Sequence, residues 1–388
     1  MKKIIEGRRI PIKMWLDEIE ESCMEQALNL SSLPFAYKHV ALMPDAHTGM
    51  GMPIGGVLAT KGVVIPNAVG VDIGCGMCAV KTSLHADDLK KRDLEELVMK
   101  IKQQIPLGFE RHKQPVDKKY LPKGYKINDL PVVKSQSDLL LLQLGTLGGG
   151  NHFIEFQKTK ENEVWVMIHS GSRNLGHTVA EHYNKEAEQW CKSQNLDFLP
   201  QLAFLPIETD LAKKYLAEMN FCIDFAFANR KLMMECVKTL LIQKFPMVKF
   251  DEMINIAHNY AAWENHFGKK VIVHRKGATR AFKDELGIIP GSQGTKSYIV
   301  KGLGNPESFM SCSHGAGRTM SRRAAQRNLD LNYEIAKMDK KGIVHGIRRK
   351  SDLDEASSAY KNIDEVMENQ KDLVTPLVEL FPMAVVKG

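Results

Sequence analysis

Apolar residues recur along the chain at two spacings, one typical of helices and the other of short strands. Helical spacing, with an apolar residue every three or four positions, covers about 14–30, 87–105 and 211–245, and a further helix is expected from about Arg318. Short apolar runs bounded by glycine and other turn residues predict strands at 57–59, 63–65, 164–168, 271–273 and 298–300. This mixture predicts an α+β fold in which short strands pack with helices.

The chain shows no convincing internal boundary. It contains no repeat and no low-complexity stretch, and no linker separates its halves. Residues 106–135, rich in Lys, Pro and Gly, predict a loop insertion, and the helix at 211–245 is long enough to project as an arm. Because polar residues suited to chemistry come from both halves, we expect a single domain over 1–388 with one composite site.

Composition narrows the class of protein only a little. Of 388 residues, 44% are hydrophobic and 26% charged, and the net charge of +7 fits a phosphate-bearing partner or simply a mildly basic surface. No apolar run approaches the roughly 18 residues that span a bilayer, and the N-terminus lacks the apolar core of a signal peptide. Seven cysteines, an odd number, argue against a disulfide framework and predict a cytoplasmic protein.

Five short segments hold the polar residues best suited to chemistry: 69–76, 148–155, 168–173, 256–260 and 311–318. The first four supply candidate metal ligands, namely Asp72, Cys75, His152, His169 and His258. A carboxylate, a thiolate and imidazoles suit a borderline-soft divalent ion such as Zn²⁺ or Mn²⁺. Each segment also has a plainer interpretation, because a Cys in a glycine turn or a His between apolar residues is more often part of the core.

The fifth segment places His314 in a loop rich in Ser and Gly, ahead of Arg318 and a predicted helix. Backbone amides and a helix N-terminus there could hold an anion, and a neutral imidazole can attack an activated phosphorus centre. The plainer alternative is a helix-capping segment with an exposed His. One Asp, one Cys and four His exceed the needs of one metal, so we expect either two metals or one metal with a nucleophilic His.

Two other catalytic motifs are disfavoured. Ser170, His169 and Asp72 could form a hydrolase triad, but Gly-x-Ser-x-Gly is absent around Ser170. No Walker phosphate-binding sequence occurs either. The residues alone therefore indicate a metal-dependent phosphoryl-transfer enzyme and go no further.

Together, and in the same order, these segments resemble the RtcB family of RNA ligases. The likeness extends over nearly the whole chain, and its blocks are Met43-Pro44-Asp45-Ala46-His47, Asp72-Ile73-Gly74-Cys75-Gly76, Gly150-Asn151-His152-Phe153, His169-Ser170-Gly171-Ser172-Arg173, His258-Asn259, Pro290-Gly291-Ser292, Ser313-His314-Gly315-Ala316-Gly317-Arg318 and Val386-Lys387-Gly388.

The resemblance implies a metal centre and a histidine that carries a nucleotide. Two Mn²⁺ ions, bridged by the Cys thiolate, would be bound by Asp72, Cys75, His152, His169 and His258. By the usual order of metal affinities, Zn²⁺ could occupy such a site as well. His314 would attack the α-phosphate of GTP, release pyrophosphate and carry GMP as a phosphoramidate.

The resemblance also implies a nucleotide pocket. The guanine would be enclosed by Phe153, Glu155, Ser297, Tyr360 and Lys387, with the Tyr ring stacked on the base. A carboxylate can accept hydrogen bonds from the guanine N1–H and amino group, and a Lys can donate to O6. Arg173 and Arg318 would clamp phosphates, because a guanidinium matches phosphate oxygens. Further contacts to the nucleotide would come from Asn151, Gly315, Ala316 and Gly317.

The substrate implied by the resemblance is RNA with a 3′-phosphate end. GMP would pass from the histidine to that phosphate, and the 5′-hydroxyl of a second RNA would then displace GMP; a 2′,3′-cyclic phosphate would first be opened. Damaged tRNA or rRNA is the expected RNA, and a release-factor-like protein accompanies some bacterial members. Two alternatives stay open: a metal-dependent phosphoesterase acting without GTP, and a non-catalytic metal-containing RNA-binding protein that needs neither His314 nor a guanine pocket.

Overall fold

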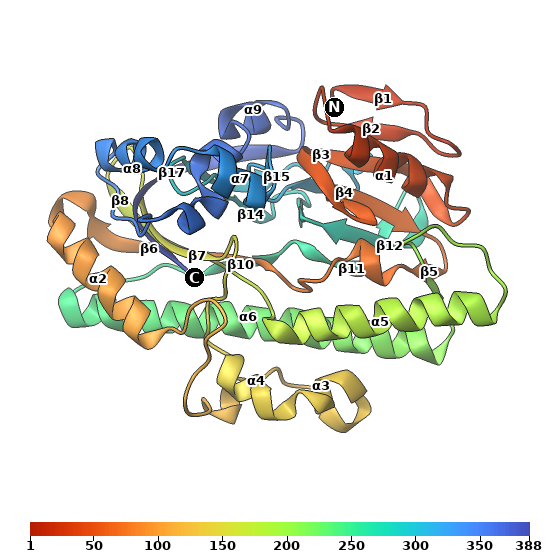
Figure 1. The fold of residues 1–388 in the computed structure, drawn as a ribbon, viewed down its shortest axis with the longest axis horizontal. Coiled ribbons are helices and arrows are strands. Elements are labelled where there is room, and N and C mark those ends of the chain that lie inside the picture. The colour runs from red at the N-terminus through yellow and green to blue at the C-terminus, as the bar shows by residue number, and fades with distance from the viewer.

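Two large sheets and a layer of long helices make up the fold of residues 1–388, all of which the computed structural model describes (Figure 1). The first sheet has the order β1-β2-β3-β4-β12-β11, with only β2 and β3 parallel. Its strands are β1 (Lys3–Ile5), β2 (Ile12–Met14), β3 (Ala36–Met50), β4 (Met52–Thr60), β11 (Asn259–His266) and β12 (Lys269–Lys276). The strands predicted at 57–59 and 271–273 lie in β4 and β12.

The second sheet is antiparallel throughout and has the order β10-β6-β8-β7-β17-β15-β14. Its strands are β6 (Gly76–His85), β7 (Phe153–Lys158), β8 (Glu163–Ser170), β10 (Ile254–Ala257), β14 (Leu286–Ile289), β15 (Ser297–Gly302) and β17 (Val374–Lys387). It contains the strands predicted at 164–168 and 298–300. Two small sheets pair β5 (Val63–Val64) with β9 (Leu205–Pro206), and β13 (Ala278–Arg280) with β16 (Ser311–Ser313).

The long helices α5 (Asn174–Ser193) and α6 (Asp210–Lys244) run side by side beneath the sheets, and α3 (Pro131–Ser135) and α4 (Ser137–Gln143) lie below them in Figure 1. The remaining helices are α1 (Glu21–Ser32), α2 (Lys91–Gln104), α7 (Arg322–Asn328), α8 (Leu331–Lys340) and α9 (Ile363–Glu368). None of the helices has the length and low charge that crossing a membrane would require. The mixture of short strands and helices agrees with the predicted α+β class.

The helix predicted at 211–245 exists as α6, but it does not project as an arm. Buried side chains occur along it from Ala212 to Leu241, including the polar Asn229 and Arg230. The helix packs against α5 and against strands of the second sheet, so apolar residues on more than one of its faces are covered. Helical spacing predicted the helix correctly and its surroundings wrongly.

Three helix starts differ from the sequence prediction, and one of them is that of the helix predicted at 87–105, which begins at Lys91. The helix expected from about 14 begins at Glu21, because Met14 ends β2 and the Trp15 side chain is fully buried beside the first sheet. The helix expected from Arg318 begins at Arg322, where the Ser321 hydroxyl accepts a hydrogen bond from the Ala324 amide and caps it. Of the loop insertion predicted at 106–135, residues 106–130 form a loop with only short 3₁₀ turns, whereas residues 131–135 form α3.

The register of the second sheet gathers several sequence motifs at one edge. Gly76, at the start of β6, pairs with Ser170 at the end of β8 and with Ala257 at the end of β10. On the other side of β8, Phe153 at the start of β7 pairs with His169, and Lys387 at the end of β17 pairs with Phe153. Antiparallel pairing therefore brings segments from five parts of the sequence to one place.

Candidate metal and nucleotide site

Three imidazoles, a thiol and a carboxylate meet at this edge of the second sheet. Cys75 Sγ lies 3.4 Å from His152 Nε2 and 3.2 Å from His169 Nε2, and the donor atoms of these three residues lie within 4.8 Å of one another. Asp72 Oδ2 is 3.3 Å from His152 Nε2, and His258 Nε2 is 3.4 Å from His169 Nε2. The structure thus brings together all five residues predicted as metal ligands.

Hydrogen bonds behind the rings determine which nitrogen faces the cluster. His152 Nδ1 donates to the Leu147 carbonyl at 2.9 Å, and His169 Nδ1 donates to the Asn151 carbonyl at 2.9 Å. In the neutral rings both Nε2 atoms therefore carry lone pairs that face the Cys75 sulfur. Lone pairs packed this closely repel one another unless a cation lies between them, so the donor set fits a divalent metal.

Burial governs the protonation of the cluster. It raises the pKa of the Cys75 thiol, and the Asp72 carboxylate raises it further. Burial lowers the pKa values of His169 and His258. For Asp72 burial also opposes ionisation, but the hydrogen bond and charge of His152 outweigh it and lower the pKa. By themselves the Cys75 thiol stays protonated and the His169 and His258 imidazoles neutral at pH 7, whereas a divalent cation would favour the thiolate.

Glycines in these segments let the ligand loops approach closely. A Cβ atom at Gly171 would lie 2.3 Å from Asp72 Oδ1, and one at Gly76 would lie 1.9 Å from the Ile256 carbonyl oxygen. Either side chain would push a ligand-bearing segment away from the cluster.

Two polar residues of α6 donate hydrogen bonds to the segments that carry Cys75 and His169. Asn229 Nδ2 donates to Ser170 Oγ and to the Gly171 carbonyl, both at 3.1 Å. Arg230 Nη1 donates to the Gly74 carbonyl at 3.0 Å and to the Ser170 carbonyl at 2.9 Å. Both side chains are fully buried, so α6 supplies the hydrogen bonds that these irregular backbone segments cannot make within the sheet.

His314 follows β16 and stands beside the metal ligands, with its ring centroid 4.8 Å from that of His258. Its Nδ1 donates to Asp45 Oδ2 at 2.6 Å, and the same oxygen accepts from the His314 amide at 3.0 Å and the Gly315 amide at 3.3 Å. The anion bound by these amides is thus the Asp45 carboxylate of the chain itself. The amides belong to residues that precede α7, so the N-terminus of that helix does not hold this anion. The arrangement leaves His314 Nε2 as the atom with a free lone pair.

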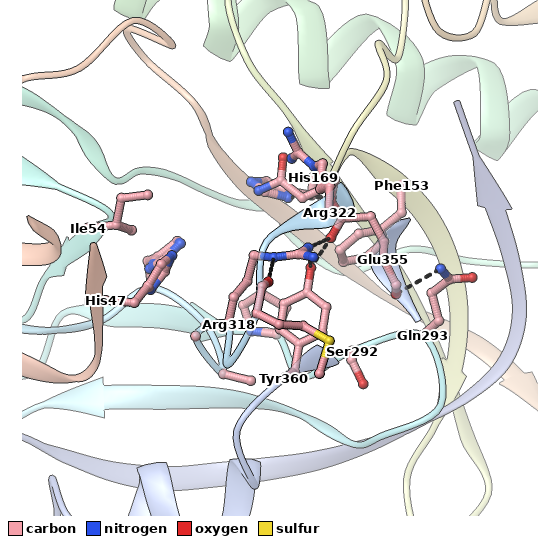
Figure 2. A pocket seen from close by; sticks show the side chains of 18 of the residues that line it. His47, Ile54, Phe153, His169, Ser292, Gln293, Arg318, Arg322, Glu355 and Tyr360 are labelled. Carbon is pink, nitrogen blue, oxygen red and sulfur yellow. Dashed lines mark hydrogen bonds and ion pairs between the residues drawn. The ribbon is translucent and has the colours of Figure 1, made fainter. Parts of the chain in front are cut away.

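His314 lines a cavity of about 630 Å³, and Figure 2 shows the side chains of other lining residues, among them His47, Arg318 and Tyr360. Nearly all residues predicted to contact the nucleotide line it, namely Asn151, Phe153, Glu155, Ser297, Gly315, Ala316, Gly317, Arg318, Tyr360 and Lys387. The exception is Arg173, which does not line the cavity. Its guanidinium donates to Thr146 Oγ1 and to the Gly108 carbonyl, both at 3.0 Å, behind the loop that carries His152.

One end of the cavity is built around a buried carboxyl group. Glu155 is 3% exposed, and burial raises its pKa well above the usual range. Gln157, which the sequence did not suggest, donates through Nε2 to Glu155 and, at 3.2 Å, to Ser297 Oγ. Lys387 donates to the Gly150 carbonyl nearby. This end therefore offers both acceptors and donors for the edge of a polar ring.

Another part of the cavity lining consists of Arg318 and Arg322, which both form ion pairs with Glu355. Arg318 Nη1 lies 2.6 Å and Arg322 Nε 2.5 Å from the carboxylate oxygens of Glu355, which also accepts from the Tyr360 hydroxyl (Figure 2). Burial opposes ionisation of Glu355, but Lys387 and the two guanidinium groups outweigh it and lower the pKa. Arg318 is thus already paired in this structure, and its predicted role as a phosphate clamp would require sharing with Glu355.

Sequence reasoning missed several groups at this site. Asp45 and His47 were recognised only as part of a motif, although both lie at the site, His47 as a lining residue. Glu355 and Arg322 carry no local signal, because their pairing joins η6 (Lys350–Glu355) to α7 only in the fold. Spacing to known motifs could have suggested Asp45, whereas nothing in the sequence identifies Glu355.

Comparison with known proteins gives a consistent result. The family described as "tRNA-splicing ligase RtcB" matches residues 26–138 and 124–388. The chain is 40% identical over 412 aligned positions to the RNA-splicing ligase RtcB of Escherichia coli, covering 100% of this chain and 99% of that protein. It is 32% identical to the tRNA-splicing ligase RtcB of Pyrobaculum aerophilum, covering 98% and 95%. It is 34% identical to the RNA-splicing ligase RtcB homolog 1 of Entamoeba histolytica, covering 95% and 84%.

Proposed function

The chain belongs to the RtcB family of RNA ligases, and we propose that it uses GTP to join RNA 3′-phosphate or 2′,3′-cyclic-phosphate ends to 5′-hydroxyl ends, with His314 as the guanylylated residue. The observation that carries the proposal is the Asp45–His314 hydrogen bond. It fixes the imidazole with Nε2 free, next to a metal-ligand cluster and a cavity large enough for a nucleotide.

In the first step His314 Nε2 attacks the α-phosphorus of GTP. A nitrogen–phosphorus bond forms, the bond to the β-phosphate oxygen breaks, and pyrophosphate leaves. Asp45 accepts the Nδ1–H throughout and stabilises the positive charge that develops on the ring. The product is GMP held on His314 as a phosphoramidate.

In the second step an oxygen of the RNA 3′-phosphate attacks the GMP phosphorus and His314 is released with its lone pair restored. The 5′-hydroxyl of the other RNA then attacks the activated 3′-phosphorus and loses its proton to solvent, and GMP leaves with the electrons of the broken phosphorus–oxygen bond. A 2′,3′-cyclic phosphate is first opened by water to a 3′-phosphate. When bound by Asp72, Cys75, His152, His169 and His258, two Mn²⁺ ions would neutralise charge on the phosphate oxygens.

The guanine is proposed to occupy the end of the cavity at Glu155. The ionised carboxyl group would accept from N1–H and the amino group, Lys387 would donate to O6, and Tyr360 would stack on the ring. Supporting this arrangement, Ser297 and Phe153 line the same cavity, and Gln157 links Ser297 to Glu155. The cavity volume and the mixture of donors and acceptors suit a purine nucleotide.

Several finer points belong to the same proposal. One folded unit over 1–388 is proposed because the site draws residues from both large sheets and from α6. Manganese is proposed as the working metal, and Zn²⁺ would also suit the Cys and His donors. All seven cysteines are free thiols, which supports a reducing, cytoplasmic setting. Damaged tRNA or rRNA as the substrate and a release-factor-like partner stay predictions.

The test is covalent labelling with α-³²P-GTP and Mn²⁺. Wild-type protein is expected to take up acid-labile label, and His314→Ala to take up none. His85→Ala, which removes an exposed histidine elsewhere, serves as the matched control and should label normally. Absence of label on freshly metallated wild-type protein would contradict the ligase mechanism; hydrolysis of RNA cyclic phosphate without GTP would then favour a phosphoesterase.

A further inference from the structure

The turn that follows α2 is joined directly to the glycine loop that carries metal-ligand His152. The Gly108 amide donates to the Gly148 carbonyl at 3.1 Å, and Leu107 and Gly148 form a β-bridge. The Gly108 carbonyl accepts from Arg173 on its other side. In Figure 1 this segment leaves the end of α2 beside the C-terminus and passes across α6 towards α3 and α4. Its first residues therefore lie against the loop that carries His152.

Phe109, at the tip of this turn, has no partner in the protein. Its exposure is 107%, the highest among the exposed large hydrophobic residues. The turn is nevertheless well held, because the Glu110 amide donates to the Leu107 carbonyl at 2.9 Å and the His112 amide donates to the Leu142 carbonyl at 2.9 Å. An aromatic ring on an ordered turn, presented wholly to solvent, is poised to stack on a flat ligand group.

The charges beside Phe109 favour an anionic chain. Arg111 and Lys113 are exposed and take part in no ion pair, and Glu110 is the single acidic neighbour in the turn. Across the glycine loop, a Cβ at Gly149 would lie 3.6 Å from Gly108 Cα and one at Gly150 only 2.8 Å from Arg322 Nη2. A continuous rim thus runs from Arg322, over three glycines without side chains, to the exposed ring.

We propose that the turn 107–113 is an RNA-docking element, in which Phe109 stacks on a base of a single-stranded RNA end and Arg111 and Lys113 contact its phosphates. This inference rests on the proposed function, because it assigns a path to the RNA that enters the same site. Aromatic stacking combined with cationic side chains binds single strands without requiring a particular sequence, as suits an enzyme acting on broken ends. The bare glycine rim lets the strand pass close to the backbone before its end reaches the metal ligands.

The experiment compares Phe109→Ala with Phe109→Trp in the full-length, metallated protein. Affinity is measured for short single-stranded RNAs with a 3′-phosphate or a 5′-hydroxyl end, together with KM for each RNA in ligation and the rate of self-guanylylation. Phe109→Ala is expected to weaken binding of at least one RNA by about 5- to 150-fold, the range for loss of one stacked base. Phe109→Trp should bind as wild type, and guanylylation should be unchanged in both.

The phosphate contacts are tested by Arg111→Ala/Lys113→Ala. Removing two contacts should reduce the slope of log affinity against log salt by about 1.4, because each phosphate contributes about 0.7 for single strands. Lys269→Ala/Lys270→Ala, an exposed pair at the start of β12, is the matched control and should leave the slope unchanged.

Two results would overturn the inference. One is RNA affinity within about twofold of wild type in Phe109→Ala. The other is an equal loss of guanylylation, which would mean that the turn only supports the fold. Failure of wild-type protein to label with GTP would instead count against the proposed function, and the RNA-binding comparison would still decide the docking role.

Discussion

The carboxylate of Asp45 and the imidazole of His314 lie 269 positions apart in the sequence, yet Asp45 Oδ2 is 2.6 Å from His314 Nδ1. Asp45 is fully buried and its second oxygen, Oδ1, has no hydrogen-bond partner. One oxygen therefore accepts from the ring and from two backbone amides, which fixes both the tautomer and the direction of the ring. This leaves Nε2 with the free lone pair, and it is through this atom that we propose His314 attacks.

Asp45→Asn should slow self-guanylylation by about 100-fold or more. The amide keeps the shape of the side chain but removes the negative charge that stabilises the ring as its Nε2 bonds to phosphorus. The measurement is the single-turnover rate of label transfer from α-³²P-GTP. Asp87→Asn, at an exposed carboxylate, is the control and should label at the wild-type rate. A normal rate in Asp45→Asn, with normal metal content, would show that the carboxylate has no part in the step.

Cys75→Ser should lose metal, whereas Cys78→Ser should keep it. Both thiols are buried near the start of β6, but Cys78 packs in a hydrophobic cluster and donates to the Arg230 carbonyl, while Cys75 lies between His152 and His169. Replacing the thiol by a hydroxyl should lower metal affinity by at least the 10- to 100-fold or so that loss of an outer-shell contact causes. Elemental analysis after dialysis against a weak chelator measures this. Equal metal retention in the two variants would refute the bridging position of Cys75.

The sequence predicts the candidate metal ligands of this site better than it predicts the residues that hold the site together. Cys75 and His169 could be predicted as candidate metal ligands because each stands in a short polar segment beside glycine. Glu355 and Gln157 could not, because each acts through contacts that form only after distant segments pack. The same limit explains the wrong prediction of an arm at 211–245, since helical spacing shows that a helix forms but not how many of its faces are covered.

GTP binding should strengthen as pH rises, through Glu155. Burial raises the pKa of this carboxyl group, so it is protonated over a wider pH range in the free protein than an exposed glutamate is. The proposed contacts to guanine N–H groups require the ionised form, and binding would therefore release a proton. Affinity should rise by at most about tenfold per pH unit below the raised pKa and level off above it.

The comparison for this prediction is Glu155→Gln, followed by calorimetry across pH. The variant should bind GTP more weakly and lose the part of the pH dependence that Glu155 causes in wild type. The part that comes from titration of the GTP phosphates should be the same in both proteins. Glu161→Gln, at an exposed site in the turn after β7, should behave as wild type. An identical pH dependence in Glu155→Gln and wild type would exclude this carboxyl group from guanine recognition.

Arg230→Met should destabilise the protein and loosen the metal centre together. Arg230 donates to the carbonyl groups of Gly74 and Ser170, each adjacent to a proposed ligand, and to Asn255 at 2.7 Å. Burial lowers its pKa to about 10, so the group is still charged at neutral pH. Methionine fills similar space but removes the Arg230 donor from two buried carbonyls, which should reduce the free energy of unfolding by about 2–6 kcal/mol, at about 1–3 kcal/mol for each carbonyl.

Urea unfolding of the metal-free protein measures the first effect, and metal affinity the second. Lys231→Met, the next residue on α6 and exposed, is the matched control and should change neither by much. Because Gly74 and Ser170 position Cys75 and His169, metal affinity of Arg230→Met should fall by about 10- to 100-fold, as for other outer-shell changes. Stability lost without any loss of metal affinity would mean that α6 supports the core but not the ligand geometry. An unchanged urea midpoint would show that the Arg230 hydrogen bonds do not stabilise the protein.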